Sequence, residues 1–438
     1  MKTLIKGATL NGKIVNILIE DNIFKKITEE PIPEEKDYKI IDAKNKAIMP
    51  AFYNTNTHLA MILMRGINDD KELKEWLKED IWPREELITP NDVYIATKFE
   101  ILEMIKGGSV FCSDMSKYPE ESMKAINEMG IRGVISTPER DNEKGELDEK
   151  NDEENKKLLE EKKQKIIEFI NMKNINEERI MKCISIPSIF TVSEEFLKFY
   201  SEVAKKNNMY IHIMVSETKE EVEYCKKNYG CSPIEKLEKL GLLTDKTILA
   251  YCVHVDDKDI ELIKKYKCAI AHCPASNFKL KSGLMPFQKL LDAGILITLG
   301  TDSSASNNTV SMLEEMKISA LNAKLQANKS SAGNVKDIFN TATLNGAKSY
   351  GINAGEIKEG KLADFVLYNL NHYLLLPNYN LLSNLVYSAQ NDCITDVFCD
   401  GVQLMKDRKV ENEQRICEEF RIVSEKFKNL DNSSNINC

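Results

Sequence analysis

Thiols, imidazoles and one carboxylate are the first candidates for chemistry in this 438-residue chain, which has 11 cysteines and five histidines. The cysteines are scattered from Cys112 to Cys438 without a C-x-x-C pair. An odd number at such spacings is typical of free thiols rather than of a disulfide framework or a zinc finger, so we expect them to be structural. Asp302 follows a predicted strand through Leu299-Gly300-Thr301, and we expect its carboxylate to face a pocket rather than to cap a loop.

The elements that must position these residues alternate between strand and helix from about residue 50 to residue 345. One helix is predicted to begin at Thr89-Pro90 and to end at Gly107-Gly108, because threonine caps helices, proline suits the first turn and glycine ends them. Another begins at Ser232-Pro233. Roughly seven or eight such units predict an α/β fold, a (β/α)8 TIM-type barrel.

The two ends of the chain are β-rich and are predicted to meet. Asn11-Gly12 indicates a hairpin, and strand-like segments return after residue 361. We therefore predict a composite small β-sandwich domain from residues 1–48 and 361–430, a barrel over residues 49–360, and a disordered tail at residues 431–438. The charge-rich stretch 139–163 is expected to form a solvated helix with a flexible lead-in.

Composition excludes several classes of protein. The chain has 60 Lys and Arg residues against 69 Asp and Glu residues, a formal charge of −9, whereas nucleic-acid binders usually present a basic face. No apolar run approaches the ~20 residues of a membrane span. The beginning of the chain is too polar for a signal peptide. We expect a cytoplasmic protein that binds a small molecule and neither nucleic acid nor a membrane. A homo-oligomer is compatible with the sequence.

Several segments together carry a family resemblance. They are Asn54-Thr55-Asn56-Thr57-His58, Glu75-Trp76-Leu77 with Ile81-Trp82-Pro83, Ser216-Glu217-Thr218, Pro274-Ala275-Ser276-Asn277, Leu299-Gly300-Thr301-Asp302 and Ala305-Ser306-Asn307-Asn308. In this order they resemble the amidohydrolase superfamily, in particular its branch of 5-methylthioadenosine/S-adenosylhomocysteine deaminases and chlorohydrolases. The resemblance covers almost the whole chain and implies the barrel fold predicted above.

The resemblance also implies metal-dependent hydrolysis of a C–N bond. A catalytic zinc takes three or four N or O ligands, keeps a position for water, and lowers the pKa of that water to ~7. In the family a glutamate moves the proton to the substrate ring and a histidine orients the water. These requirements can be compared with this chain position by position.

Four histidine positions of the family carry other residues here. Asn56 stands at the first histidine of the metal-binding pair, Met214 at the histidine of the fifth strand, Tyr251 at that of the sixth strand, and Pro187 at a substrate-facing histidine. An amide oxygen is a weak zinc ligand and a thioether suits copper(I). The substitutions therefore predict a degenerate metal site.

The remaining family positions are retained. His58 and Asp302 are the two metal-ligand positions left, and Glu217 is the proton-transferring glutamate. Trp82 and His272 also stand at pocket positions, although we expect His272 to belong to a structural turn. His254 and His372 are expected to have no ligand-like neighbours.

Some placements remain open from the sequence alone. His212 lies on the same strand face as Met214 but two residues, ~6.6 Å, deeper in the barrel. His58 either binds a metal or is buried against Asp302, and Tyr251 is a candidate to fill the metal position and to bond with Asp302. A buried Glu217 without a cation should have a raised pKa. Loosely aligned arginines, Arg132 and Arg140, are candidates to bind an anionic substrate tail.

Two main hypotheses follow, and we favour the first. The first is a non-catalytic or strongly impaired relative of the deaminases, which binds a purine-like ligand or a partner subunit and needs no cofactor. The second is an active aminohydrolase of amino-purine nucleosides or related heterocycles. It would hold zinc, iron or manganese with an unusual set such as His58, His212, Tyr251 and Asp302. A metal-independent enzyme built on Glu217 and Asp302 is a third class without a positive motif.

Overall fold

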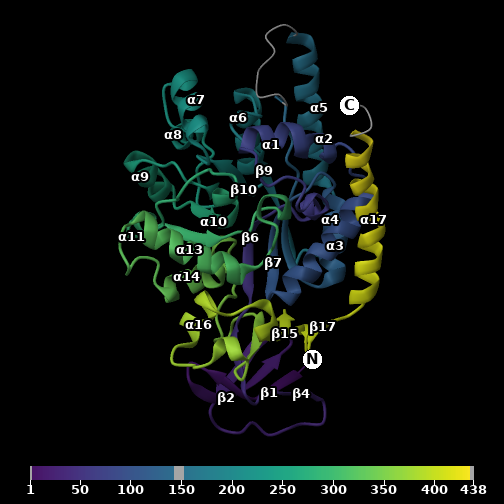
Figure 1. Cartoon of the computed structure of the whole chain (residues 1–438), viewed down its shortest axis with the longest axis vertical. Coiled ribbons are helices and arrows are strands. Elements are labelled where there is room, and N and C mark those ends of the chain that lie inside the picture. Colours follow the sequence, from purple (N-terminus) through teal and green to yellow (C-terminus); the bar gives the residue numbers. More distant parts are fainter. Residues whose placement is uncertain (1, 143–151, 435–438) are drawn as a thin grey trace.

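The computed structural model, which describes residues 2–142 and 152–434, consists of a parallel barrel above a mixed sheet (Figure 1). Eight parallel strands follow one another around the barrel in chain order. They are β6 (Phe52–Thr57), β7 (Ser109–Met115), β8 (Arg132–Ser136), β9 (Ile180–Ile186), β10 (Tyr210–Val215), β11 (Thr247–Tyr251), β12 (Ala269–His272) and β13 (Leu296–Leu299). The predicted (β/α)8 barrel is confirmed.

The barrel closes between its first and last strands, directly beside the predicted site. Thr57 and Asp302 form a parallel bridge, and the Asp302 N–H donates to the Asn56 carbonyl at 3.0 Å. Below this point the Thr55 hydroxyl donates to the Leu299 carbonyl at 2.8 Å. Closure therefore fixes the backbone of Asn56 against that of Asp302.

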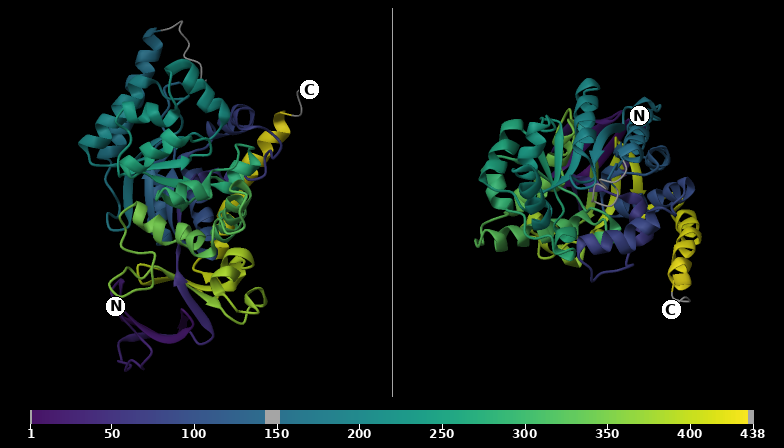
Figure 2. Two further views of the ribbon diagram at one scale, coloured as in Figure 1. Left: turned by 90° about the vertical axis from the view of Figure 1, so that its left-hand side faces the viewer. Right: turned by 90° about the horizontal axis from the view of Figure 1, so that it is seen from above.

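Helices surround the strands, as Figures 1 and 2 show. The longer ones around the barrel are α3 (Pro90–Lys106), α4 (Pro119–Met129), α5 (Asp152–Asn171), α6 (Glu194–Lys206), α7 (Lys219–Tyr229), α8 (Pro233–Lys239), α9 (Asp257–Tyr266), α13 (Met312–Gln326) and α14 (Val335–Ala342). Shorter ones are η1 (Leu59–Met64), α1 (Leu73–Trp76), η2 (Leu77–Ile81), α2 (Trp82–Glu85), α10 (Pro274–Lys279), α11 (Phe287–Asp292), α12 (Ser304–Asn307) and α15 (Leu344–Ser349). The predicted helix starts are confirmed in α3 and α8, whose caps Thr89 and Ser232 each accept a backbone N–H three residues on.

The second sheet has nine strands, which come from residues 2–50 and 365–410. They are β1 (Lys2–Leu10), β2 (Lys13–Glu20), β3 (Ile23–Thr28), β4 (Tyr38–Asp42), β5 (Lys46–Pro50), β14 (Phe365–Asn369), β15 (Ile394–Cys399), β16 (Val402–Lys406) and β17 (Lys409–Val410). Antiparallel pairing of β14 with β5 joins the two ends. This confirms a small β domain built from both termini, while the exact domain boundaries stay predictions.

An ion-pair network fastens the barrel to this sheet at the amino end of β8. The Arg132 Nε donates to Asp364 Oδ2 at 2.9 Å, and its Nη2 donates to Asp400 Oδ1. The Tyr53 hydroxyl donates to the same Asp364 carboxylate. Arg132 is buried at the end of the barrel opposite to the strand ends that carry the site, so the prediction that it binds a substrate tail is wrong.

The last helix, α17 (Glu413–Ser434), packs along α3. Phe420 stacks on Phe99 with ring centroids 4.0 Å apart, and Lys426 pairs with Asp92 at 2.7 Å. The tail predicted from residue 431 is corrected at residues 431–434, which form the end of this helix. Its buried face, with Val423 and Phe427 at helical spacing, favours continuation of the helix, whereas the prediction considered only the polar composition of the end.

The remaining predictions on order fall partly outside the described residues. The helix expected in the charge-rich stretch corresponds to the beginning of α5, and its predicted lead-in, residues 143–151, lies outside the described ranges. Residues 435–438 of the predicted tail also lie outside these ranges. Within those ranges, no helix is both long and apolar enough to cross a membrane.

Candidate functional site

Asp302, just beyond β13, is at the centre of the site. Its backbone has a φ of 60°, and its side chain is buried. Three hydroxyls donate to Oδ2: Ser276 at 2.7 Å, Ser306 at 3.1 Å and Tyr251 at 3.2 Å. His58 Nε2 lies 3.4 Å from Oδ1. The carboxylate is therefore stabilised by side chains of the protein on both of its oxygens.

Tyr251 reaches Asp302 from the end of β11. Its hydroxyl is also 3.6 Å from the Met214 sulfur, so it lies between two positions that the resemblance assigns to metal ligands. Burial and the charge of Asp302 hold the pKa of Tyr251 well above its usual value. The backbone at Tyr251 has a φ of 73°, and Cys252 one of 49°. Such a conformation costs about 1–3 kcal/mol in a non-glycine residue and is found mostly at functional sites.

Asn56 completes this side of the site from β6. Its Nδ2 donates to the Cys273 sulfur at 3.3 Å, whereas Oδ1 is buried without a hydrogen-bond partner among the described residues. The neighbouring position at Gly300 has to be glycine, because a Cβ there would lie 2.6 Å from the Asn56 Cβ. The sequence Leu299-Gly300-Thr301 thus lets the ends of β6 and β13 approach closely.

His212 is held deeper in the barrel. Its Nδ1 lies 3.0 Å from the Ser113 hydroxyl, which accepts a hydrogen bond from Tyr350 at 2.7 Å. Burial lowers the pKa of His212 to about 3, so the ring is neutral. Its Nε2 is buried and finds no partner in the described part of the chain.

Glu217 follows β10 and adopts the protonated form at neutral pH. Burial, together with the negative charges of Asp302 and Glu221, raises the pKa of Glu217 to about 8. Its Oε1 accepts a hydrogen bond from the Ser282 hydroxyl at 3.0 Å. Burial also raises the pKa of Glu221 to about 7, although that carboxyl accepts the backbone N–H groups of Ser216 and Glu217. Glu217 can therefore donate a hydrogen bond to a ligand.

The other predicted pocket residues offer fewer groups that could bind a ligand or transfer a proton. Pro187 follows β9 and offers no donor. Trp82 begins α2, with the Arg140 guanidinium 5.2 Å from its ring. His272 is fully buried, packs against Phe287, and its pKa is lowered to about 3 by that burial. The structure thus gathers His58, Met214, Tyr251 and Asp302 in direct contact, whereas His272 lies in the core.

Four residues of the site had not been singled out from the sequence. They are Ser276 and Ser306 against Asp302, Cys273 against Asn56, and Ser282 against Glu217. Three of them lie in or beside segments that carry the resemblance, which is the only signal the sequence offered. Three of the contacts join residues 26 to 217 positions apart, which spacing along the chain could not identify; only Ser306 is close to its partner, four residues from Asp302.

The donor set does not fit a zinc ion. Of His58, Asp302, Tyr251, Met214 and Asn56, only the first two are ordinary zinc ligands; His212, whose Nε2 has no partner among the described residues, is held deeper in the barrel by Ser113. The other three groups are a phenol whose pKa is raised, a thioether and an amide that donates to a thiol. Two serine hydroxyls and the phenol already occupy Asp302 Oδ2. A cation would have to bind at Oδ1, where His58 is the one other strong ligand among these five side chains.

Comparison with known proteins identifies the class. The chain matches the amidohydrolase family over residues 47–404 and belongs to that family. It is 39% identical over 410 residues to the 5'-deoxyadenosine deaminase of Methanosphaera stadtmanae, covering 93% of this chain and 94% of the relative. It is 40% identical over 408 residues to the 5'-deoxyadenosine deaminase of Methanocaldococcus jannaschii, with the same coverage. The solved zinc-bound adenosine deaminase of Xanthomonas campestris superimposes with a TM-score of 0.85 at 25% identity, covering 98% of each chain.

Proposed function

We propose that this protein is a nucleoside-binding relative of the 5'-deoxyadenosine deaminases that does not carry out metal-dependent hydrolysis. The observation that carries this proposal is the Tyr251 hydroxyl, which bonds to Asp302 and contacts Met214 where the resemblance assigns metal ligands. The protein's own side chains satisfy the carboxylate that a metal would need. The fold around Asp302 therefore does not need a bound metal.

A purine nucleoside is the ligand that the site and the relatives favour. A protonated Glu217 donates a hydrogen bond, and the ring nitrogens of adenine are acceptors. Oε1 of Glu217 is bonded to Ser282, so Oε2 remains the oxygen that can carry the proton toward a ligand. The named substrate of both archaeal relatives is an adenine nucleoside, and we propose the same class of ligand here.

The rate argument points the same way. A positioned acid or base contributes roughly 10²–10⁴-fold to a rate, and Tyr251 replaces the histidine that would perform this step. The loss of the metal-activated water would add to that deficit. We therefore propose a barrel that keeps ligand recognition while its hydrolytic step is strongly impaired.

A second candidate, an active metal-dependent aminohydrolase, is favoured by two buried atoms. Asn56 Oδ1 and His212 Nε2 lack hydrogen-bond partners among the described residues, and each is a possible ligand atom. Zinc, iron or manganese held by His58, His212, Tyr251 and Asp302 would use one of them. Against this set, the Tyr251 hydroxyl would first have to lose a proton that burial and Asp302 hold firmly.

The direct test is calorimetric titration of the full chain with 5'-deoxyadenosine, followed by an ammonia assay on the same sample. We expect binding without ammonia release. Glu217→Gln, which keeps a donor, should bind as the parent does, whereas Glu217→Leu should bind about 10-fold more weakly because one hydrogen bond is lost. Absence of binding in the parent would refute nucleoside recognition, and multiple-turnover ammonia release would support the second candidate.

Assembly and location remain separate predictions. A homo-oligomer and a cytoplasmic location are proposed from the sequence alone, and the site described above is formed within one chain.

A further inference from the structure

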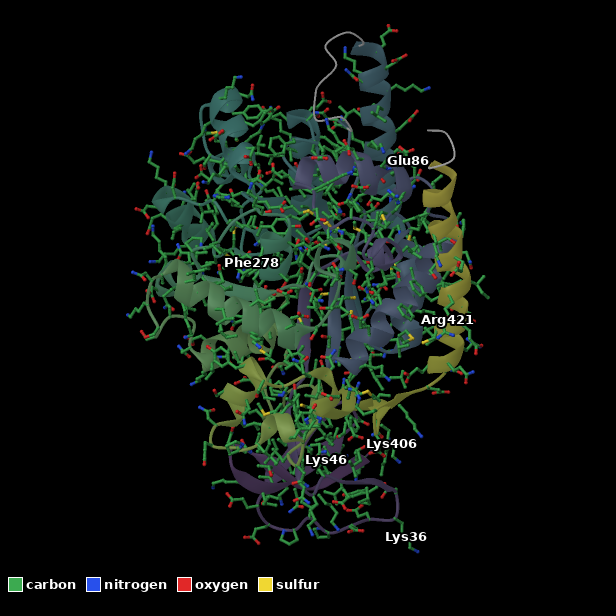
Figure 3. All side chains as sticks on the ribbon, viewed as in Figure 1. Lys36, Lys46, Glu86, Phe278, Lys406 and Arg421 are labelled. Atoms are coloured by element: carbon green, nitrogen blue, oxygen red, sulfur yellow. The ribbon has the colours of Figure 1, made fainter. Side chains whose placement is uncertain are left out.

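A second group of potential ligands lies outside the barrel, where β14 and β15 leave the small sheet. His372 follows β14 and caps the short helix η3 (Tyr373–Leu375), and Asp392 and Cys393 end η4 (Asn391–Cys393) just before β15. Antiparallel pairing of β14 with β15 brings these segments together. The group lies just beyond Asn369, the last residue of β14. Asn369 pairs with Lys46 of β5, and Lys46 is labelled in Figure 3.

The three side chains are within ligand distance of one another. The Cys393 sulfur lies 3.3 Å from His372 Nδ1 and 4.0 Å from Asp392 Oδ1, and His372 Nε2 lies 3.4 Å from Asp392 Oδ2. One ligand atom from each residue falls within 4.8 Å of the other two. The expectation that His372 has no ligand-like neighbour is therefore wrong. Asp392 and Cys393 come 20 or more residues later, and only the strand pairing brings them to it.

We propose that His372, Asp392 and Cys393 form a binding site for a zinc-like divalent cation. Imidazole, carboxylate and thiolate are the three kinds of protein ligand that zinc uses. Tetrahedral geometry with bonds of about 2.0–2.3 Å places ligand atoms roughly 3.4–3.6 Å apart. The separations of Cys393 Sγ from His372 Nδ1 and from Asp392 Oδ1, 3.3 and 4.0 Å, are close to these values, and the three ligand atoms lie within 4.8 Å of one another.

The hydrogen bonds of His372 suit this role. Its Nδ1 accepts the Leu374 N–H at 3.3 Å, so this nitrogen carries a lone pair. The other nitrogen, Nε2, then carries the proton and faces Asp392 Oδ2. A cation bound at Nδ1 would displace the Leu374 N–H from that nitrogen, and the Asp392 carboxylate would turn from Nε2 toward the ion.

The surrounding charges leave room for a cation. Arg408 is a cation close to Cys393. Its Nη1 already donates hydrogen bonds to the carbonyl oxygens of Lys106, Asn391 and Ile394. Burial raises the pKa of Cys393, the Asp392 charge raises it further, and Arg408 opposes them. Metal-bound cysteine is a thiolate, so binding of an ion here would be accompanied by loss of the thiol proton. The Asp392 side chain is 55% exposed, which gives the ion a route in and water a fourth position.

This site contrasts with the barrel site in its fit to zinc. Cys393 Sγ and His372 Nδ1 are two strong ligands in contact, and no hydroxyl occupies the Asp392 carboxylate within the described residues. It also bears on any measurement of total metal, because an ion bound here would be counted as if it were in the barrel.

The test is titration of the reduced full-length protein with Co²⁺, followed by displacement with Zn²⁺. We expect one cobalt per chain with a near-ultraviolet sulfur-to-cobalt charge-transfer band that zinc abolishes. Cys393→Ser should remove the band, and Asp392→Asn should weaken binding at least about 10-fold. Asp392 is exposed, so this variant retains the fold even if the buried cysteine variant does not.

Two matched variants locate the ion. Cys417→Ser, which alters a cysteine on α17, and His58→Asn, which alters the barrel site, should both leave the cobalt band unchanged. No band, or a band that survives in both Cys393→Ser and Asp392→Asn, would overturn the proposal. Loss of the band in His58→Asn would place the ion in the barrel and would contradict the proposed function instead.

Discussion

The two ends of the barrel stabilise a buried aspartate in different ways. At the amino end of the strands, Asp364 accepts from Arg132 and from the Tyr53 hydroxyl, so a negative charge meets a permanent positive one. At the carboxyl end, Asp302 accepts from three hydroxyls, with His58 at 3.4 Å. At the carboxyl end, neutral hydroxyl groups stabilise the aspartate, whereas at the amino end the Arg132 cation stabilises it.

This difference indicates that the fold depends more on a cation at the amino end of the strands than at their carboxyl end. Removing Arg132 would leave two acidic groups without their cation, whereas the site around Asp302 has enough neutral donors to exist without one. A family histidine replaced by Tyr251 has therefore not left a void. The Tyr251 hydroxyl supplies a hydrogen-bond donor to the Asp302 carboxylate instead.

The largest expected effect is the gain from restoring three histidines together, Asn56→His, Met214→His and Tyr251→His. The variant should bind zinc tightly and release ammonia from 5'-deoxyadenosine at a rate at least about 10²-fold above the parent, because a metal and an acid–base group return together. Elemental analysis and an ammonia assay measure both.

A matched triple variant, Asn56→Gln, Met214→Leu and Tyr251→Phe, keeps volume without adding imidazoles and should gain neither property. Equal zinc and equal turnover in the parent and the restored variant would contradict the account. Zinc without turnover would direct attention to Pro187, the remaining substituted position.

The next effect concerns the opposite end of the barrel. Arg132→Met should lower the free energy of unfolding by about 3–5 kcal/mol, because Asp364 and Asp400 would keep their charges without the partner. Denaturant unfolding measures this change. Arg140→Met, which removes a half-buried arginine paired with Glu85, should cost no more than about 1 kcal/mol. Unchanged stability with weaker nucleoside binding in Arg132→Met would restore the substrate-binding role that the structure argues against.

A smaller effect tests the neutral donors. Tyr251→Phe removes one hydrogen bond to a carboxylate and should lower the free energy of unfolding by about 1.5 kcal/mol, since the two serines remain. Tyr368→Phe is the matched control, because in the described residues the Tyr368 hydroxyl is buried without a partner. That variant should be neutral or slightly stabilising. Equal effects in thermal and denaturant unfolding of the two variants would show that the bond to Asp302 contributes nothing.

The smallest effect per unit of change is on the pH dependence of stability. The pKa of Glu217 is raised to about 8 in the folded protein, against 4.5 for the ordinary group. The folded state therefore holds a proton that the unfolded state has lost, and stability falls as pH rises between these values. Glu217→Gln should make this fall shallower by up to about 1 kcal/mol per pH unit. Glu221 and Glu100, whose pKa values are raised to about 7 and about 8, should keep part of the slope in the variant. An unchanged slope would mean that Glu217 is ionised in the fold.

Local sequence signals predicted the frame well. Thr89-Pro90 and Gly107-Gly108 mark the two ends of α3, and Asn11-Gly12 forms the turn between β1 and β2. Each signal acts over a few residues, where capping and turn chemistry decide the backbone. The end of α17 was misjudged, because its packing on α3 joins Phe420 to Phe99 across the length of the chain.

The contacts of the site were less predictable for the same reason. Tyr251 was anticipated near Asp302 because the resemblance aligned it with the histidine of the sixth strand and aligned Asp302 with a metal ligand. The serines that complete the carboxylate's shell were not anticipated, and neither was the approach of Cys393 to His372. Ser276 and Cys393 reach their partners through strand pairing, which no local pattern encodes, whereas Ser306 lies only four residues from Asp302 and depends on the turn into α12.

The most direct test of the central claim is the zinc content of the Cys393→Ser variant, measured by elemental analysis after dialysis against zinc and then against metal-free buffer. This variant removes the proposed second site, so any remaining zinc reports on the barrel. The account predicts a zinc content far below one ion per chain. Near-stoichiometric zinc that disappears when His58→Asn is added would place a metal beside Asp302 and contradict the account.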